Sequence, residues 1–262
     1  MIDANSDDLS FETPAQVEAY CRFFLSVRPS DSLAEFPSQE EFDEYQNKRE
    51  RALHAQLDEL SRIDFTKANR QKVEGTYFKI TKKSHVNPLS SEGSNKASTR
   101  FNFKDIPLLR NRAIYLGKSK LGCEYELFHL EDQRRILKNK FLPDPNANQD
   151  DFIFPDHVVY EYEVSLDNVL ILTTKPSCDA IFIQTRVILN EWYEHNYQFD
   201  IPTAGQVLAT LARIQGFKGI LYTSTRIQTE TNLVVFEENS GELSFKQISK
   251  TPYNQPSEWL LK

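Results

Sequence analysis

The chain has 262 residues, with 38 acidic against 31 basic side chains and a formal net charge of -7 at pH 7. Its mean hydropathy of -0.54 is typical of a soluble globular protein, and no stretch approaches the roughly 18–20 apolar residues of a membrane span. The acidic balance argues against a nucleic-acid-binding platform, because phosphate backbones are bound by basic surfaces.

Several other classes of site are excluded by short motifs that the sequence lacks. The glycines form neither a dinucleotide-binding series nor a P-loop, and no serine-hydrolase elbow occurs. Cys21, Cys123 and Cys178 are odd in number and widely spaced, which indicates reduced thiols. The histidines show no metal-binding spacing, so we expect neither a metal nor a bound cofactor. The acidic start, residues 1–8, is unlike a secretory or mitochondrial leader, and a cytoplasmic location is expected.

Two capped helices are predicted at the beginning of the chain. Thr13 to Gln16 forms a capping box with a proline at the first helical position, and this helix should end before Pro29. A second capping box at Ser38 to Glu41 opens a helix whose apolar residues recur at helical spacing to about Arg70. Residues 1–74 are therefore expected to form a helical extension.

Short segments rich in β-formers begin at Gly75. Strands are predicted at Thr76–Ile80 and Arg112–Leu116, and the serine- and asparagine-rich residues 84–98 between them indicate a loop. Ser119 can cap the helix that follows the second of these strands.

The second half of the chain is also mixed. Strands and helices are interspersed rather than strictly alternating, which predicts an α+β fold. The predicted elements are strands at 158–164 and 169–173, helices at 181–197 and 203–216, strands at 219–224, 232–236 and 243–247, and an exposed loop at 143–155.

Four polar residues could carry chemistry, although each also has a purely structural interpretation. Arg100 lies where a polar loop meets a strand, and a guanidinium there can grip a phosphate with two donors. Tyr115 sits in an aliphatic strand, as core tyrosines often do. The helical periodicity directs Glu126 inwards, where a carboxylate needs a partner or a function, and it directs Glu124 towards solvent. Ser224 ends a strand, where ligand-binding hydroxyls and simple turn hydroxyls both occur.

Taken in order, these segments resemble the RES domain family, which is named for an arginine, a glutamate and a serine. The resemblance covers about residues 75–240 and rests on six motifs that occur in the family's order and spacing. The motifs are Tyr77–Ile80, Thr99–Asn102, Ile114–Ser119 with the Glu126 helix, Val164–Thr173, Trp192 with Thr203–Gln206, and Gly216–Ser224 with Asn232–Phe236.

The resemblance implies an ADP-ribosyltransferase-like fold, in which helices surround a mixed β-sheet. The catalytic domain would span residues 75–250 and be followed by a tail at 251–262. The implied enzyme degrades NAD+ by hydrolysis or phosphorolysis of the nicotinamide–ribose bond and acts as an intracellular toxin. NAD+ would then be a substrate rather than a cofactor, phosphate a possible second substrate, and an Xre-type antitoxin the protein partner.

The same resemblance implies roles for individual residues. Arg100 would hold the NAD+ phosphates, and Tyr115 would line the nicotinamide pocket. Glu126 would serve the reacting ribose, and Ser224 would hydrogen-bond the ligand. Further substrate contacts would come from Lys79, Asn102, Ser119 and Tyr77.

Lys79 stands where the family usually has an arginine, and a lysine there keeps the positive charge but loses the two-donor fork. This departure keeps open a non-catalytic nucleotide-binding module. A mono-ADP-ribosyltransferase that modifies a protein target is the other alternative.

Overall fold

The fold is known from a computed structural model of the chain. It describes residues 15–17, 19–20, 37–60, 62–85, 87–91, 98–104, 106–127, 157–189, 195–196, 199–240 and 245–253. The predicted loop at 143–155, Cys21, Trp192 and most of the first predicted helix lie outside these residues.

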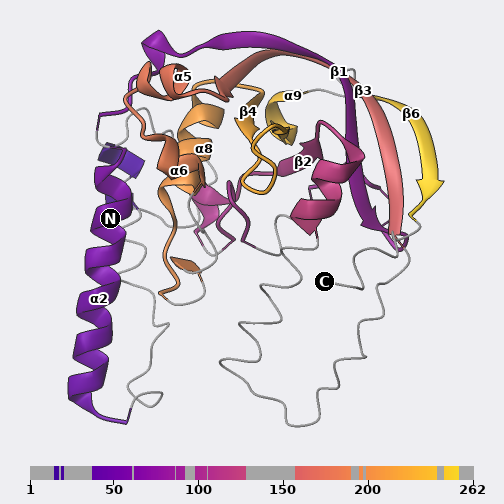
Figure 1. Ribbon diagram of the computed structural model, residues 1–262. Coiled ribbons are helices and arrows are strands. Elements are labelled where there is room, and N and C mark those ends of the chain that lie inside the picture. Colours follow the sequence, from indigo (N-terminus) through magenta and orange to yellow (C-terminus); the bar gives the residue numbers. More distant parts are fainter. Residues whose placement is uncertain are drawn as a thin grey trace.

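Six strands form one mixed sheet that closes on itself. The hydrogen-bonded order β1-β2-β5-β4-β3 returns to β1, because β1 also pairs with β3 along its length, and β6 lies on the outer side of β3. β3 and β4 run parallel, and the other pairs are antiparallel. In Figure 1 the long β1 and β3 arch together over the top of the molecule and descend beside β6. The strands are β1 (Arg70–Lys82), β2 (Ala113–Gly117), β3 (His157–Leu172), β4 (Gly219–Thr223), β5 (Thr231–Phe236) and β6 (Phe245–Pro252).

Alternation along the strands gives the sheet two apolar faces, and each face has its own core. On β2, Ala113 and Tyr115 belong to the larger cluster under the helices, whereas Ile114 and Leu116 belong to a second cluster. The second cluster lies on the opposite face of β2, between it and the long strands β1 and β3, and includes Tyr162. This period of two is what a sheet buried on both faces requires.

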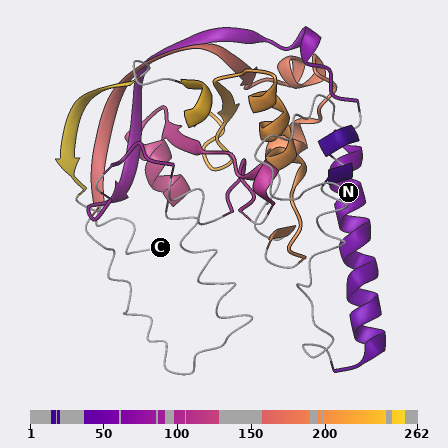
Figure 2. The ribbon, with the colours of Figure 1, turned by 180° about the vertical axis from the view of Figure 1, so that it is seen from behind.

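Helices cover one face and one side of the sheet. α2 stands at the side of the molecule, next to α6 and α8 (Figure 1), and the view from behind shows the same arrangement (Figure 2). Residues 120–127 form a further helix directly after β2. The labelled helices are α2 (Gln39–Asp58), α5 (Lys175–Asp179), α6 (Thr185–Leu189), α8 (Ala204–Ile214) and α9 (Glu237–Ser240).

Two of the predicted caps are confirmed. The Ser38 hydroxyl accepts a hydrogen bond from the Glu41 amide at 3.2 Å, and α2 begins at the next residue. At the start of α8 the Gln206 side chain accepts from the Thr203 amide at 2.8 Å. α8 ends just before Gly216, whose φ of +77° lies in the left-handed region that glycine adopts at little energetic cost.

α2 shares the larger core with the rest of the protein. Leu53 and Leu57 of α2, with Leu60 just after its end, are buried in the same cluster as Leu208 and Phe217. The helix that precedes the predicted catalytic domain therefore packs as part of one hydrophobic core.

Several predicted element boundaries were wrong. α2 ends at Asp58 rather than near Arg70, where β1 already begins. The two strands expected at 158–164 and 169–173 are one strand, because pairing with β1 continues past Asp167 and Asn168, where the register shifts and Asn168 adopts a φ of 54°. The helix expected from Ile181 begins only at Thr185, since Phe182 adopts a left-handed φ of 59°.

The described part of the chain contains no helix with the length and apolar character of a membrane span.

Candidate functional site

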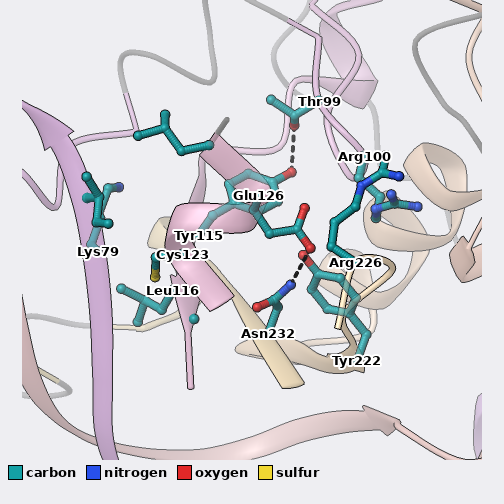
Figure 3. A pocket seen from close by; sticks show the side chains of 13 residues that line it. Lys79, Thr99, Arg100, Tyr115, Leu116, Cys123, Glu126, Tyr222, Arg226 and Asn232 are labelled. Atoms are coloured by element: carbon teal, nitrogen blue, oxygen red, sulfur yellow. Dashed lines mark hydrogen bonds between the residues drawn. The ribbon is translucent and has the colours of Figure 1, made fainter. Parts of the chain in front are cut away.

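A pocket of about 260 Å³ opens where β1, β2, β4 and β5 meet the helix at 120–127 (Figure 3). It brings together Lys79, Arg100, Tyr115 and Glu126, four of the residues singled out from the sequence. The described residues that line it are Lys79, Ile80, Thr99, Arg100, Tyr115, Leu116, Gly117, Cys123, Glu126, Leu127, Tyr222, Arg226 and Asn232.

The carboxylate of Glu126 is held through one of its two oxygens. Oε1 accepts from the Ser224 hydroxyl at 3.0 Å and from the Asn232 amide nitrogen at 2.8 Å. Among the described residues, none donates a hydrogen bond to Oε2. Two donors, one directly after β4 and the other on β5, thus fix the side chain's orientation and leave its second oxygen for a ligand.

Strand register explains why these donors converge. Asn232 on β5 lies directly between Gly117 of β2 and Tyr222 of β4. Ser224 follows Tyr222 by two residues, which directs both side chains to the same side of the chain. The donors of Glu126 therefore come from neighbouring positions at one end of the sheet.

The helix that carries Glu126 is placed by a close contact with the end of β2. A Cβ atom on Gly117 would lie 2.6 Å from Cys123 Sγ, closer than real contacts allow. Ser119 caps the helix, its hydroxyl accepting from the Gly122 amide at 2.9 Å. Glycine at position 117 is thus required for the observed distance between strand and helix.

Tyr115 connects β2 to the turn that carries Arg100. Its hydroxyl accepts from the Phe101 amide at 3.1 Å and shares a 2.6 Å hydrogen bond with the Thr99 hydroxyl. Burial raises the pKa of Tyr115 to about 12, so the phenol is neutral at physiological pH. Burial, together with the Glu126 charge, also raises the pKa of Tyr222 well above its usual value.

Three basic side chains and one carboxylate line the pocket in the part of the chain that is described. Arg100 is 8% exposed and donates from Nη1 to the Ile188 carbonyl at 2.6 Å and from Nη2 to the Thr225 hydroxyl at 3.3 Å. Arg226 lies on the same side as Arg100, and Lys79 lies across the pocket from both (Figure 3).

Burial lowers the pKa of Lys79 to about 8. Within a protein of net charge -7, this concentration of basic groups favours an anionic ligand.

The other predicted site residues lie outside this lining. Asn102 is fully buried and pairs through its backbone with Thr99. Ser119 is the helix cap described above, and Tyr77 is buried beneath the Lys118 ammonium, 4.4 Å from its ring centroid. Ser224 is also buried; it lines an adjoining cavity of about 360 Å³ and reaches the main pocket through its bond to Glu126.

Glu124 does not face solvent as its helical position suggested, and that prediction was wrong. It is 4% exposed, with its carboxylate 3.6 Å from Lys120 Nζ. The side of the helix away from the pocket is covered as well, since Lys120 also reaches over the ring of Tyr253, just after β6. The described part of this helix, residues 120–127, is covered on two sides and has fewer exposed positions than its periodicity implies.

Sequence reasoning missed five polar residues that line the pocket. Asn232 carried a usable signal, because an amide stands at the start of an otherwise aliphatic strand. The other four could be placed in the pocket only from the strand register or from the fold of the turns around Ser224. The missed residues are Thr99, Cys123, Tyr222, Arg226 and Asn232.

The described residues hold no group of three or more histidine, cysteine or acidic side chains that could bind a metal ion. Cys123 and Cys178 are free thiols. Burial raises the pKa of Cys123 to about 12, which keeps it a thiol inside the pocket.

Comparison with known proteins gives one family and one fold. A family model described as the RES domain matches residues 76–254. Comparison with curated proteins finds no match. Among solved structures, the chain is similar to one in the crystal structure of the M. tuberculosis MbcT–MbcA toxin–antitoxin complex. The TM-score is 0.53 at 20% sequence identity, over 75% of this chain and 92% of that one. The predicted α+β fold, a mixed sheet with surrounding helices, is thereby confirmed.

Proposed function

Because the chain belongs to the RES domain family, we propose that its pocket binds NAD+ and that Glu126 promotes cleavage of the nicotinamide–ribose bond. The observation that carries this proposal is the Glu126 carboxylate, whose Oε1 is held by Ser224 and Asn232 while no described residue donates to its Oε2. A fixed carboxylate in a pocket with three basic side chains suits a substrate that has both an anionic part and a carbon that becomes cationic.

Cleavage of this bond develops positive charge on the ribose, as in glycoside hydrolysis. The fixed carboxylate of Glu126 stabilises that charge, and Oε2 accepts a hydrogen bond from a ribose hydroxyl. Nicotinamide leaves as a neutral molecule, so the reaction needs no strong general acid. Water or phosphate then adds to the ribose carbon and gives ADP-ribose or its phosphate ester.

The remaining lining residues would contact different parts of the substrate. Lys79, Arg100 and Arg226 supply positive charge for the pyrophosphate. The neutral rings of Tyr115 and Tyr222 offer apolar walls for nicotinamide. At about 260 Å³ the pocket lies below the usual range of roughly 300–1,000 Å³ for sites that enclose a whole ligand. We therefore place the nicotinamide riboside end inside it.

We further propose that the chain is the toxin of a toxin–antitoxin pair with an Xre-type partner. The support is the family together with the similar solved structure, which is that of a toxin–antitoxin complex. Induced expression should stop cell growth, and Glu126→Gln should restore it. A small helix-turn-helix protein encoded next to this chain should protect cells; failure to protect would count against that partner.

The test of the activity is nicotinamide release from NAD+ by the purified full-length protein. Glu126→Gln keeps the shape of the side chain but removes its charge, and we expect the rate to fall by roughly 100- to 1,000-fold. Glu124→Gln is the matched control on the same helix and should keep the wild-type rate.

Equal rates for wild type and Glu126→Gln would refute the assignment. Binding of NAD+ in calorimetry without turnover would instead identify a non-catalytic module. Transfer of label from NAD+ to a lysate protein would identify a protein-modifying enzyme. Comparing the products with and without phosphate identifies the acceptor.

A further inference from the structure

The helix that precedes the family-matched region contacts the start of another helix through a buried side chain. Gln56, on α2, is 7% exposed, and its Oε1 accepts from the Ala204 amide at 2.9 Å. Ala204 is the first residue of α8, where amide groups have no partner within their own helix. Residue 56 lies before residue 76, where the family match begins. A segment outside that match therefore supplies the acceptor for the first amide of α8.

The first turn of α8 holds the turn that carries Arg100. Gln206 is fully buried, and its Nε2 lies 2.6 Å from the Thr99 carbonyl and 3.0 Å from the Asn102 carbonyl. Thr99 and Asn102 also pair with each other through their backbones, at 2.8 and 3.3 Å. One amide group thus holds both ends of a four-residue turn, and Arg100 is its second residue.

The close approach of the α8 backbone also supports its contact with the turn that carries Arg100. A Cβ atom on Gly205 would lie 3.3 Å from the Arg100 carbonyl oxygen, so the backbone of α8 lies directly against the turn. The Thr99 hydroxyl at one end of the turn is bonded to Tyr115 in the pocket wall. A shift of the α8 start would therefore move both Arg100 and the contact of Thr99 with Tyr115.

We propose that α2 is a positioning element of the pocket. Gln56 fixes the start of α8, Gln206 in that first turn fixes the Thr99–Asn102 turn, and the turn sets the place of Arg100. Neither glutamine touches the pocket itself, so both are positioning residues. The kinetic part of the proposal rests on the function proposed above, whereas its structural part does not.

The chemistry of Gln206 explains why an amide stands there. Its Oε1 accepts from the Thr203 amide at 2.8 Å, while its Nε2 donates to the carbonyls of the turn. A carboxylate could serve the first role but would set an oxygen against two carbonyl oxygens. Asn196 completes the network, its Oδ1 lying 2.8 Å from Gln206 Nε2, and no ionised side chain takes part in these bonds.

The experiment compares Gln56→Met and Gln206→Met in the full-length protein, with Gln39→Met as control. Gln39 is an exposed glutamine at the start of the same helix, and its side chain bonds to no described residue other than Asp43. If Arg100 binds the phosphates, its displacement raises the KM for NAD+ and leaves kcat nearly unchanged. We expect KM to rise about tenfold for Gln206→Met, several-fold for Gln56→Met and not at all for Gln39→Met.

A double-mutant cycle tests whether the effect passes through Arg100. In an Arg100→Ala background the increase caused by either glutamine substitution should shrink to less than about twofold. A general loss of structure would give the same increase in both backgrounds and would overturn the proposal. If Gln206→Met does not fold, the cycle with Gln56→Met alone decides.

Hydrogen exchange separates this proposal from the proposed function. Gln56→Met should speed exchange of the Thr99 and Asn102 amides, which pair across the turn, and leave the amides paired between β1 and β3 unchanged. If NAD+ is neither bound nor cleaved but the turn exchanges faster, the proposed function fails and the positioning role stands. If NAD+ is cleaved but KM and exchange are unaffected, the positioning role fails.

Discussion

Lys79 is a basic group of the pocket whose charge depends on pH near neutrality. Burial lowers its pKa to about 8, so the charged form predominates below that pH and is lost above it. If this charge attracts the phosphates, the Kd for NAD+ should rise by up to about tenfold from pH 7 to pH 9. In Lys79→Arg the charge persists, and the Kd should stay nearly constant. Calorimetry across this range checks the prediction, and parallel curves for the two proteins would contradict it.

The same residue should cost the protein stability. Between the folded pKa of about 8 and the usual lysine value of 10.5 the unfolded chain binds more protons, so stability increases with pH across that window. At pH 7 the full penalty applies, and Lys79→Met should stabilise the fold by about 3 kcal/mol. The gain should shrink above pH 10. Lys82→Met, on the exposed end of the same strand, should change little in denaturant unfolding; an equal gain there would refute burial as the cause.

At the residue scale, the sequence predicted those pocket residues whose side chain is of an unusual type for its position in a predicted element. Arg100 at a loop–strand junction and Glu126 on an inward helix face are examples, and both line the pocket. Tyr222 was missed because its place beside Asn232 depends on the register between β4 and β5. Glu124 was misplaced because no local signal reports that the region around Tyr253 covers its side of the helix.

At the level of elements, the contact between β2 and the Glu126 helix allows a sharp test. In Gly117→Ala the added methyl would collide with Cys123 Sγ, and the helix must move away. We expect a loss of about 1–3 kcal/mol in stability and a larger relative loss of activity. Gly122→Ala, within the helix, meets only an ordinary 3.4 Å contact with Ser119 and should be neutral or stabilising.

Restoration by a second substitution identifies the cause of the Gly117 effect. Cys123→Ala removes the sulfur and should return part of the stability and activity to Gly117→Ala. Thermal unfolding and nicotinamide release are the two measurements. No recovery in the double variant would mean that the backbone around Ser119, not the thiol, limits the approach.

Elements with local signals were predicted well, and elements shaped by distant partners were not. α8 has its glutamine cap at one end and Gly216 at the other, and both are visible in the sequence. The break predicted between residues 164 and 169 is only a β-bulge in β3, because β1 pairs with β3 on both sides of it, as far as Arg70. Pairing with a long neighbouring strand can keep residues in a strand although their own conformational preference favours a turn.

At the scale of the whole molecule, α2 and the sheet share one core, which predicts joint unfolding. The amides around Leu53 and Leu57 should exchange with the same opening free energy as those of α8, since the two helices bury side chains in one cluster. Hydrogen exchange over a range of denaturant concentrations measures both. Earlier opening of α2 alone would show that it is an appended unit.

The closed sheet could not be read from the chain. It depends on pairing between residues 70–82 and 157–170, which are far apart in sequence and carry no shared motif. The family resemblance supplied the class of fold, and the family match confirms that class over residues 76–254. The role of α2 in the core lies outside that match and emerged only from packing.

The pocket draws its lining from positions scattered between Lys79 and Asn232 rather than from one contiguous segment. If the chain halts growth when expressed, random mutagenesis followed by simple survival becomes a structural probe. Missense survivors that still accumulate folded protein should fall at these separated positions and at the supports of Arg100. A colony count would thus trace, in the linear gene, the outline of a site that exists only after folding.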